Sequence, residues 1–171
     1  MTRSNRFCHF GGWSDREPSG SNPEWRVRPA LREDFDAWSE LFAGYCDFYE
    51  RPSTAEHRRR VWSWIEDGTI HCLLAVPTGG ASDRAVGLAH VRPMPSPLRG
   101  TTTGFLDDLF VTPAARGTGA FECLMSAIRD LAAAEGWPQV RWITAADNAR
   151  ARSAYDRVAK KTDWVTYQLD P

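Results

Sequence analysis

The sequence predicts one α/β (α+β) domain, and three observations lead to that expectation. The length of 171 residues fits a single domain, for which about 100–200 residues is usual. Hydrophobic residues make up 42% and charged residues 25% of the chain, which is ordinary globular composition. Strand-type and helix-type hydrophobic periodicities follow each other along the chain in a defined order.

The domain is expected to begin at Trp25, after a polar segment rich in Gly, Ser and Pro. We therefore assign residues 1–24 to an N-terminal extension and residues 25–171 to the domain. Large and polar side chains alternate over residues 25–31, which predicts a strand. Residues 33–49 begin with acidic side chains and place apolar side chains on one face, which predicts an amphipathic helix.

A second helix and three strands follow. Ser53 and Glu56 have the spacing of a capping box and predict a helix that continues to Asp67 and stops at Gly68. Three apolar runs separated by turn-forming residues then predict an antiparallel meander. These runs cover residues 70–78, 84–94 and 101–113.

The last third of the chain alternates between helices and strands. A short glycine-rich loop leads into a helix that ends at Gly136. A buried strand is predicted over residues 139–145, a short helix over residues 148–159 and a closing strand over residues 164–170.

Composition excludes several classes of function. The chain has 21 Lys+Arg and 22 Asp+Glu, a net charge of −1 and a pI near 6.4, so the basic excess of a nucleic-acid-binding domain is missing. It has neither a leader-like apolar region nor a run of about 18 apolar residues, so we expect a soluble, cytoplasmic protein that does not bind membranes. The four cysteines have no zinc-site spacing, so no metal is expected.

The loop Arg116-Gly117-Thr118-Gly119-Ala120 is the most informative motif. Small residues at a helix N-terminus let backbone N–H groups converge on an anion such as a pyrophosphate. No Gly-Lys-Ser/Thr follows, which excludes a Walker loop, and Glu122 stands where a Rossmann fingerprint has its third glycine. The alternative is that the glycines only turn the chain.

At these residues the sequence resembles the GCN5-related N-acetyltransferase (GNAT) family. The motifs are FLDDLFVTPAARGTGA and, after the helix, WITAADNARARSAYDRV. The resemblance is specific over residues 105–160 and extends more loosely to residues 25–170. It implies a central mixed, mostly antiparallel sheet flanked by helices on both faces, and an enzyme that transfers an acetyl group from acetyl-coenzyme A (acetyl-CoA) to an amine.

The resemblance also implies the residues that bind acetyl-CoA. The pyrophosphate would lie on the loop of residues 116–120, although Phe121 stands where the family usually has Gly or Ala. The pantetheine arm would pair with the backbone of a strand, and a side chain after the fifth strand would contact the cofactor. The expected cofactor-binding residues are Leu109, Phe110, Val111, Arg116, Gly117, Thr118, Gly119, Ala120 and Asn148.

Two candidate catalytic residues follow. An amine is mostly protonated at pH 7 and needs a base before it can attack the thioester. The resemblance favours Asp107 as a base that acts through water, whereas Asp108 would serve the acceptor site. Tyr155 is the candidate acid that protonates the leaving thiolate. The alternative is that these carboxylates and this tyrosine are only structural.

The resemblance places the acceptor site against the first two helices. In this family the first two helices form one of its walls, and Tyr45 and Tyr49 there, with Asp108 and His90, are the expected substrate-binding residues. A normal amphipathic face or a structural histidine would explain the same residues. The expected activity is acetylation of a small-molecule primary amine by direct attack in a ternary complex. The alternatives are a protein or peptide N-acetyltransferase and a non-catalytic acyl-CoA-binding module.

The closing strand is also a candidate for pairing or exchange with a second copy of the chain, which would form a homodimer.

Overall fold

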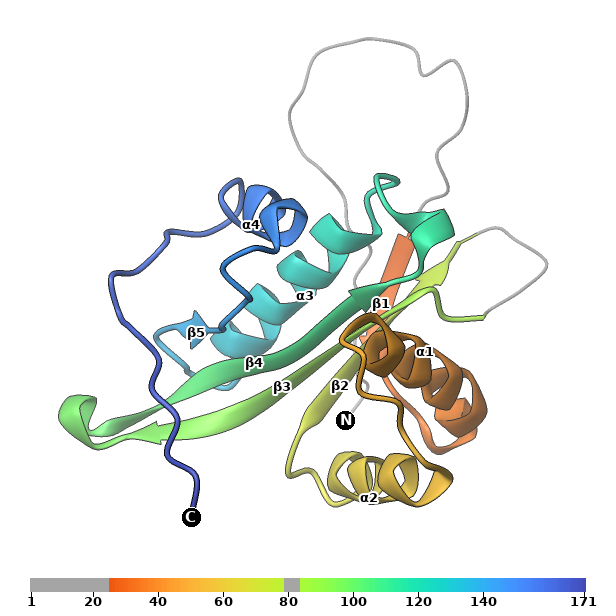
Figure 1. Ribbon diagram of the computed structural model, residues 1–171, viewed down its shortest axis with the longest axis horizontal. Helices are drawn as coiled ribbons and strands as arrows, with labels where there is room; N and C mark the ends of the chain where they lie inside the picture. The colour runs from red at the N-terminus through yellow and green to blue at the C-terminus, as the bar shows by residue number, and fades with distance from the viewer. Residues whose placement is uncertain (1–24, 79–83) are drawn as a thin grey trace, which may run out of the picture.

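The computed structural model describes residues 25–78 and 84–171 (Figure 1). The predicted N-terminal extension, residues 1–24, lies outside the described residues. The helices and strands, in chain order, are β1 (Trp25–Pro29), α1 (Phe35–Phe48), α2 (Ala55–Glu66), β2 (His71–Pro77), β3 (Gly87–Ser96), β4 (Thr101–Val111), α3 (Ala120–Ala134), β5 (Val140–Arg141) and α4 (Ala149–Tyr155).

The five strands form one sheet in the order β1-β2-β3-β4-β5. Strands β1 to β4 pair antiparallel with their neighbours, and β5 pairs parallel with β4. Helices α1 and α2 cover one face of the sheet, and α3 covers the other with α4 beside it (Figure 1). The predicted α/β class and the mixed, mostly antiparallel sheet with helices on both faces are confirmed.

Each face of the sheet carries its own apolar cluster, because successive side chains of a strand point to opposite faces. On β2, Leu73 and Ala75 pack toward α3, whereas Leu74 and Val76 pack toward α1 and α2. Trp38 of α1 is fully buried in the second cluster. The two clusters fix α1 and α3 on opposite sides of β4, and this arrangement positions the candidate site.

The predicted capping box before α2 is wrong by one residue. Thr54 is the N-cap, and its hydroxyl accepts a hydrogen bond from the backbone N–H of His57 at 3.1 Å. Ser53 instead accepts hydrogen bonds from the Arg58 side chain through its backbone carbonyl and its hydroxyl. Gly68, with φ +79°, lies just after the helix as predicted.

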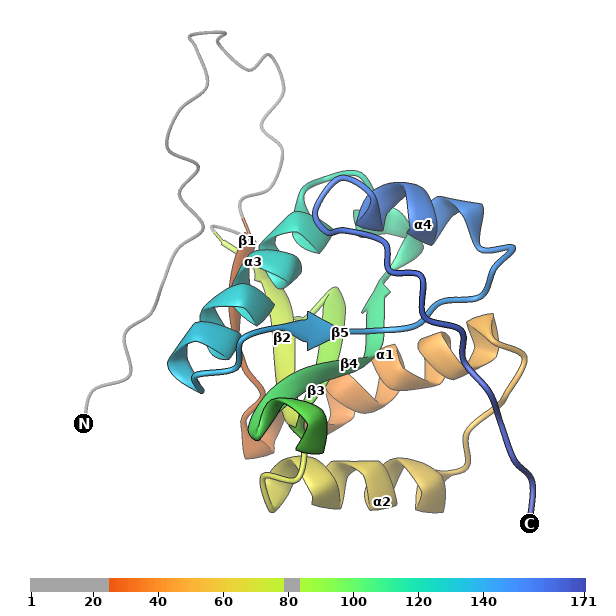
Figure 2. The same ribbon diagram turned by 90° about the vertical axis from the view of Figure 1, so that its left-hand side faces the viewer.

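The closing strand predicted over residues 164–170 is also wrong for the single chain. Residues 160–171 are all exposed and form no strand, and in Figures 1 and 2 they run from α4 without joining the sheet. A strand exists only by pairing with a sheet edge, and this segment does not reach β5. The predicted fifth strand is correspondingly short, with β5 limited to Val140–Arg141.

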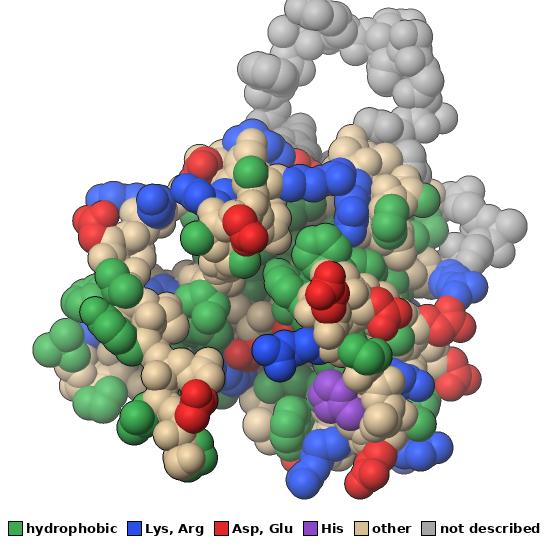
Figure 3. Space-filling model, viewed as in Figure 1, with side chains coloured by type: hydrophobic (Ala, Val, Ile, Leu, Met, Phe, Trp, Pro, Cys, Tyr) green, Lys and Arg blue, Asp and Glu red, His purple; other side chains and the backbone are tan. Residues whose placement is uncertain are grey.

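Lys/Arg and Asp/Glu side chains are interspersed on the face shown in Figure 3. Across the described parts of the chain, no helix combines the length and the apolar character needed to cross a bilayer.

Candidate active site

A β-bulge brings two adjacent carboxylates to one site. His90 of β3 pairs with Asp108 of β4, but the next residue, Val91, pairs with Leu106, so Asp107 is an extra residue in β4. Without the bulge, Asp107 and Asp108 would point to opposite faces. With it, Asp107 lines a pocket, and Asp108 hydrogen-bonds a residue that lines the same pocket, Tyr45.

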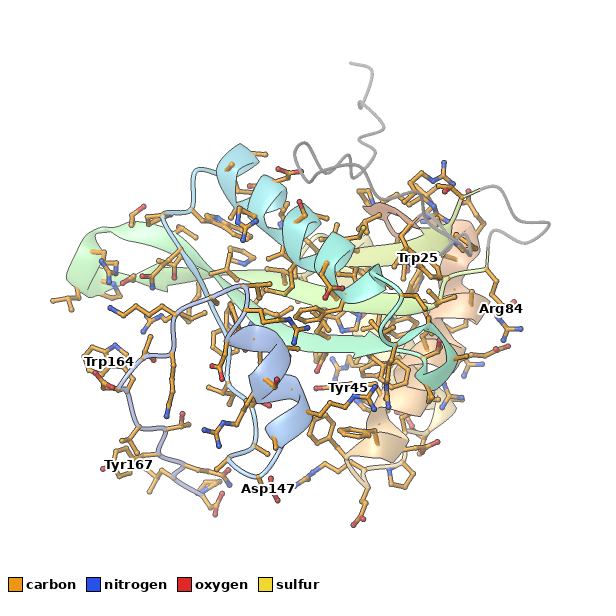
Figure 4. All side chains as sticks on the ribbon, turned by 90° about the horizontal axis from the view of Figure 1, so that it is seen from above. Trp25, Tyr45, Arg84, Asp147, Trp164 and Tyr167 are labelled. Atoms are coloured by element: carbon orange, nitrogen blue, oxygen red, sulfur yellow. The ribbon has the colours of Figure 1, made fainter. Side chains whose placement is uncertain are left out.

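That pocket is small and lies where α1, α4, β4 and the segment after β5 meet. It brings together the predicted catalytic pair, Asp107 and Tyr155, the predicted acceptor residues Tyr45 and Tyr49, and the predicted cofactor residue Leu109. Figure 4 places Tyr45 between α1 and α4. Its full lining is Tyr45, Tyr49, Leu106, Asp107, Leu109, Trp142, Ile143, Thr144 and Tyr155.

Space for the pocket arises because β4 and β5 are paired over only two residue pairs. Gly104 pairs with Val140 and Phe105 with Arg141. Beyond them, the segment after β5 turns toward α4 (Figure 2). Leu109 on β4 and Ile143 after β5 therefore line opposite walls of the pocket. Trp142, Ile143 and Thr144 were missed by the sequence analysis, because they fall inside a predicted continuous strand and nothing in their pattern marks where pairing stops.

Tyr155 is held in the pocket by two aromatic rings. Its ring centroid lies 5.2 Å from that of Trp142 and 5.9 Å from that of Phe121. Burial, with a smaller effect from Tyr49, raises the pKa of Tyr155 to about 12. The phenol is therefore protonated at neutral pH and can donate a proton or a hydrogen bond.

Asp107 lines the same pocket, and 32% of its side chain is exposed. Burial raises the pKa of its carboxyl above the ordinary range, and the neighbouring Arg92 opposes that shift. Arg92 forms an ion pair with Asp107, with Nε 3.0 Å from Oδ2. A carboxylate with a raised pKa is a stronger base than an ordinary aspartate.

His90 differs from the expectation that it contacts the acceptor. Only 1% of its surface is exposed, and both of its ring nitrogens are engaged inside the protein, with Trp38 and with Asp108. His90 therefore contacts Asp108 and does not line the pocket, which differs from the predicted direct contact with the acceptor.

The glycine-rich loop has the geometry of an anion cradle. Gly117 and Gly119 have φ of +79° and +97°, a left-handed conformation that favours glycine. Gly119 is the N-cap of α3, so the first N–H groups of this 15-residue helix point out of its end without intrahelical acceptors. The indole N–H of Trp25 holds the loop by donating to the Thr118 carbonyl at 2.8 Å.

The side chain of Arg116 does not project from this loop. Its Nε donates to the Val111 carbonyl at 3.1 Å, and its guanidinium lies 5.9 Å from the ring centroids of Phe48 and Phe110. Arg116 thus ties the loop to the end of β4, and the backbone N–H groups are left as the anion donors.

Phe121 and Asn148 have structural contacts of their own. The Phe121 ring packs toward Tyr155, so this side chain lies between α3 and α4 while its backbone N–H stays in the first turn of α3. The side-chain oxygen Oδ1 of Asn148 caps α4 by accepting from the Ala151 N–H at 3.1 Å.

No group of three or more His, Cys, Asp or Glu side chains is arranged for a metal ion within residues 25–78 and 84–171.

Comparisons with known proteins agree with this geometry. The Acetyltransferase (GNAT) family matches residues 35–159. The D-amino-acid N-acetyltransferase HPA3 of Saccharomyces cerevisiae is 29% identical over 156 residues, which cover 91% of this chain and 97% of that protein.

Two solved structures show the same fold. A ribosomal-protein-alanine N-acetyltransferase from Brucella melitensis biovar Abortus has a TM-score of 0.72 at 20% identity, with 85% of this chain and 99% of that chain covered. The aminoglycoside N-acetyltransferase AAC(6')-Iy in complex with CoA has a TM-score of 0.72 at 16% identity, with 91% and 99% covered. Since the family match spans most of the chain, this protein belongs to the GNAT acetyltransferase family.

Proposed function

We propose that the protein transfers the acetyl group of acetyl-CoA to a primary amine of a small molecule, by direct attack within a ternary complex. The observation that carries this proposal is the pocket that is lined both by a carboxylate of raised pKa, Asp107 of β4, and by a protonated phenol, Tyr155 of α4. That arrangement supplies a base for the amine and an acid for the leaving thiolate.

The residues present fit acetyl-CoA. The N–H groups at the start of α3, with left-handed Gly117 and Gly119, suit the pyrophosphate. The backbone of Leu109, Phe110 and Val111 lies beyond the point where β4 pairs with β5, so it can pair with the amides of the pantetheine arm as an added strand would. Bound there, acetyl-CoA supplies the thioester that the amine attacks.

Asp107 accepts a proton from the substrate ammonium through a water molecule, which leaves a neutral amine able to attack. Its ion pair with Arg92 holds the carboxylate at the bulge. Tyr155 then donates its hydroxyl proton to the departing sulfur; a phenol is neutral at pH 7–8, and burial raises the pKa of Tyr155 further, to about 12.

Two relatives favour a small amine as the acceptor. One is named as a D-amino-acid N-acetyltransferase, and the other is an aminoglycoside N-acetyltransferase. The pocket wall formed by Tyr45 and Tyr49, with Asp108 behind Tyr45, suits a cationic nitrogen through aromatic and carboxylate contacts.

The test is release of CoA from acetyl-CoA, detected with a thiol reagent, across D-amino acids, polyamines, aminoglycosides and a lysine-containing peptide. Fast release with a free amine supports the proposal. Turnover of the peptide alone would replace it with a protein acceptor.

We also propose that the protein forms a homodimer through its C-terminal segment, residues 160–171. In residues 160–171 four large apolar side chains, Trp164, Val165, Tyr167 and Leu169, are 71–94% exposed, and Figure 4 shows Trp164 and Tyr167 away from the sheet. Large and polar residues alternate there as in a strand. The two-residue strand β5 is the last in the sheet, and a hollow of about 340 Å³ lies between it, α3 and the segment that follows α4. The segment of a second copy can pair at that edge.

Light scattering at micromolar concentration tests this assembly. A dimer that becomes a monomer when residues 160–171 are deleted supports it, whereas a monomeric full-length chain refutes it.

A further inference from the structure

A row of four hydrogen-bonded side chains leads from the buried face of α1 to the candidate acceptor pocket. The indole N–H of Trp38 donates to Nε2 of His90 at 2.8 Å. Nδ1 of His90 lies 2.8 Å from Oδ2 of Asp108, and the Asp108 carboxylate faces Tyr45, whose pKa it raises through its charge and as a hydrogen-bond acceptor for the hydroxyl. Trp38 and His90 are almost completely buried, whereas Asp108 is partly exposed.

The direction of every bond in this row is determined by its first member. An indole nitrogen can only donate, so Nε2 of His90 carries no proton and accepts. The proton of the neutral imidazole is then on Nδ1, and it is donated to the Asp108 carboxylate. A doubly protonated imidazole would place two N–H groups against each other in a buried site, so His90 does not neutralise Asp108 by becoming a cation.

The row ends at the hydroxyl of Tyr45. Burial, together with the charge of Asp108, raises the pKa of Tyr45 well above its usual range, so this side chain is a neutral phenol. A carboxylate only accepts hydrogen bonds, so the single hydroxyl proton of Tyr45 is donated to Asp108. Tyr45 lines the pocket. On that side its hydroxyl oxygen can only accept a hydrogen bond, because its proton is already donated to Asp108.

We infer that Trp38 and His90 are positioning residues that act through Asp108 to hold the Tyr45 hydroxyl as a hydrogen-bond acceptor, and that this oxygen selects the N–H group of the acceptor amine. The inference rests on the proposed function and deepens it. It makes Tyr45 a specificity residue for groups that donate a hydrogen bond, in a pocket whose other polar side chains include Asp107, Tyr49, Thr144 and Tyr155.

Kinetics of two His90 variants test the inference. His90→Phe removes the donor to Asp108, so the KM of the best amine in the CoA-release panel should rise about 10-fold, equal to about 1.4 kcal/mol, while the KM of acetyl-CoA stays unchanged. His90→Asn keeps an amide N–H that can reach Asp108 and should restore most of the affinity. The N-trimethylated form of the same amine has no N–H to donate, so its inhibition constant should be equal in the wild type and His90→Phe.

A general loss of structure would weaken the amine and its trimethylated form alike, and that result would overturn the inference. Equal KM values for the amine in the wild type and His90→Phe would overturn it too, while leaving the proposed function in place.

The tautomer of His90 gives a readout that needs no turnover. Two-bond ¹H–¹⁵N NMR spectra of the full chain should show His90, assigned by the loss of its signals in His90→Asn, with a protonated Nδ1 and a bare Nε2. Trp38→Phe should shift the Nε2 signal. Trp62→Phe, which alters another buried indole that packs on Trp38, should leave that signal and the activity unchanged.

A protonated Nε2 or a doubly protonated ring in the wild type would overturn the inference whether or not any amine turns over. If the tautomer is as expected and no amine supports CoA release, the proposed function has failed, and the selection of an amine by Tyr45 fails with it.

Discussion

Replacing Tyr155 with Phe tests the acid step of the proposed mechanism. Burial raises the pKa of Tyr155 to about 12, so at pH 8, four units lower, only about one molecule in 10⁴ lacks the phenolic proton. Loss of a general acid costs ~10²–10⁴-fold, which is ~2.7–5.5 kcal/mol in the activation free energy. We expect kcat for CoA release to fall by at least about 100-fold.

The change should leave binding and folding nearly intact. Phe keeps the ring contacts with Trp142 and Phe121, so the Tm and the KM of acetyl-CoA should stay close to those of the wild type. The assay is CoA release with a thiol reagent at saturating acetyl-CoA and amine. Tyr167→Phe is the matched control, because that tyrosine is 89% exposed and far from the pocket (Figure 4). A kcat of Tyr155→Phe equal to that of this control would refute the assignment.

Four further substitutions test other parts of the site and the fold. The raised pKa of Asp107 means that kcat/KM should fall as pH drops through that pKa, above the ordinary value near 3.9, and Asp107→Asn should abolish this acidic limb and lower kcat. Gly119→Ala places a Cβ at φ +97°, which costs ~1–2 kcal/mol, so the KM of acetyl-CoA should rise about 10-fold in titrations of initial rate. Gly104→Ala would put a Cβ 2.6 Å from the ring of Trp137, and calorimetry should show a loss of ~1–3 kcal/mol in unfolding free energy. Asp34, whose pKa is lowered by its ion pair with an arginine of β1, stabilises the fold above about pH 4 and loses this effect as pH falls through its lowered pKa; the Tm difference between wild type and Asp34→Asn should therefore be present at pH 7 and shrink in acid.

Local patterns predicted most of the fold. The alternation in β1, the helical spacing in α1 and the glycines around α3 act through neighbouring residues, so the sequence alone is enough to find them. The glycine-rich loop was predictable for the same reason, because left-handed backbone at Gly117 and Gly119 is a property of the residues themselves.

Features that depend on distant partners were not predictable. The bulge that brings Asp107 to the pocket and Asp108 to His90 arises from the register between β3 and β4. The burial of His90 depends on a tryptophan 52 positions away in sequence. The prediction of a strand over residues 164–170 was wrong for the single chain. The alternating pattern predicts a strand, but it does not say which sheet edge, or which copy of the chain, that strand pairs with.

The most direct test of the account is an initial-rate study of CoA release in which acetyl-CoA and the best amine of the panel are varied together. Direct attack in a ternary complex predicts release that depends on the amine and double-reciprocal lines that intersect. Parallel lines would indicate an acetylated enzyme intermediate and contradict direct attack at the pocket of Asp107 and Tyr155. Absence of amine-dependent release would contradict the proposed transferase itself.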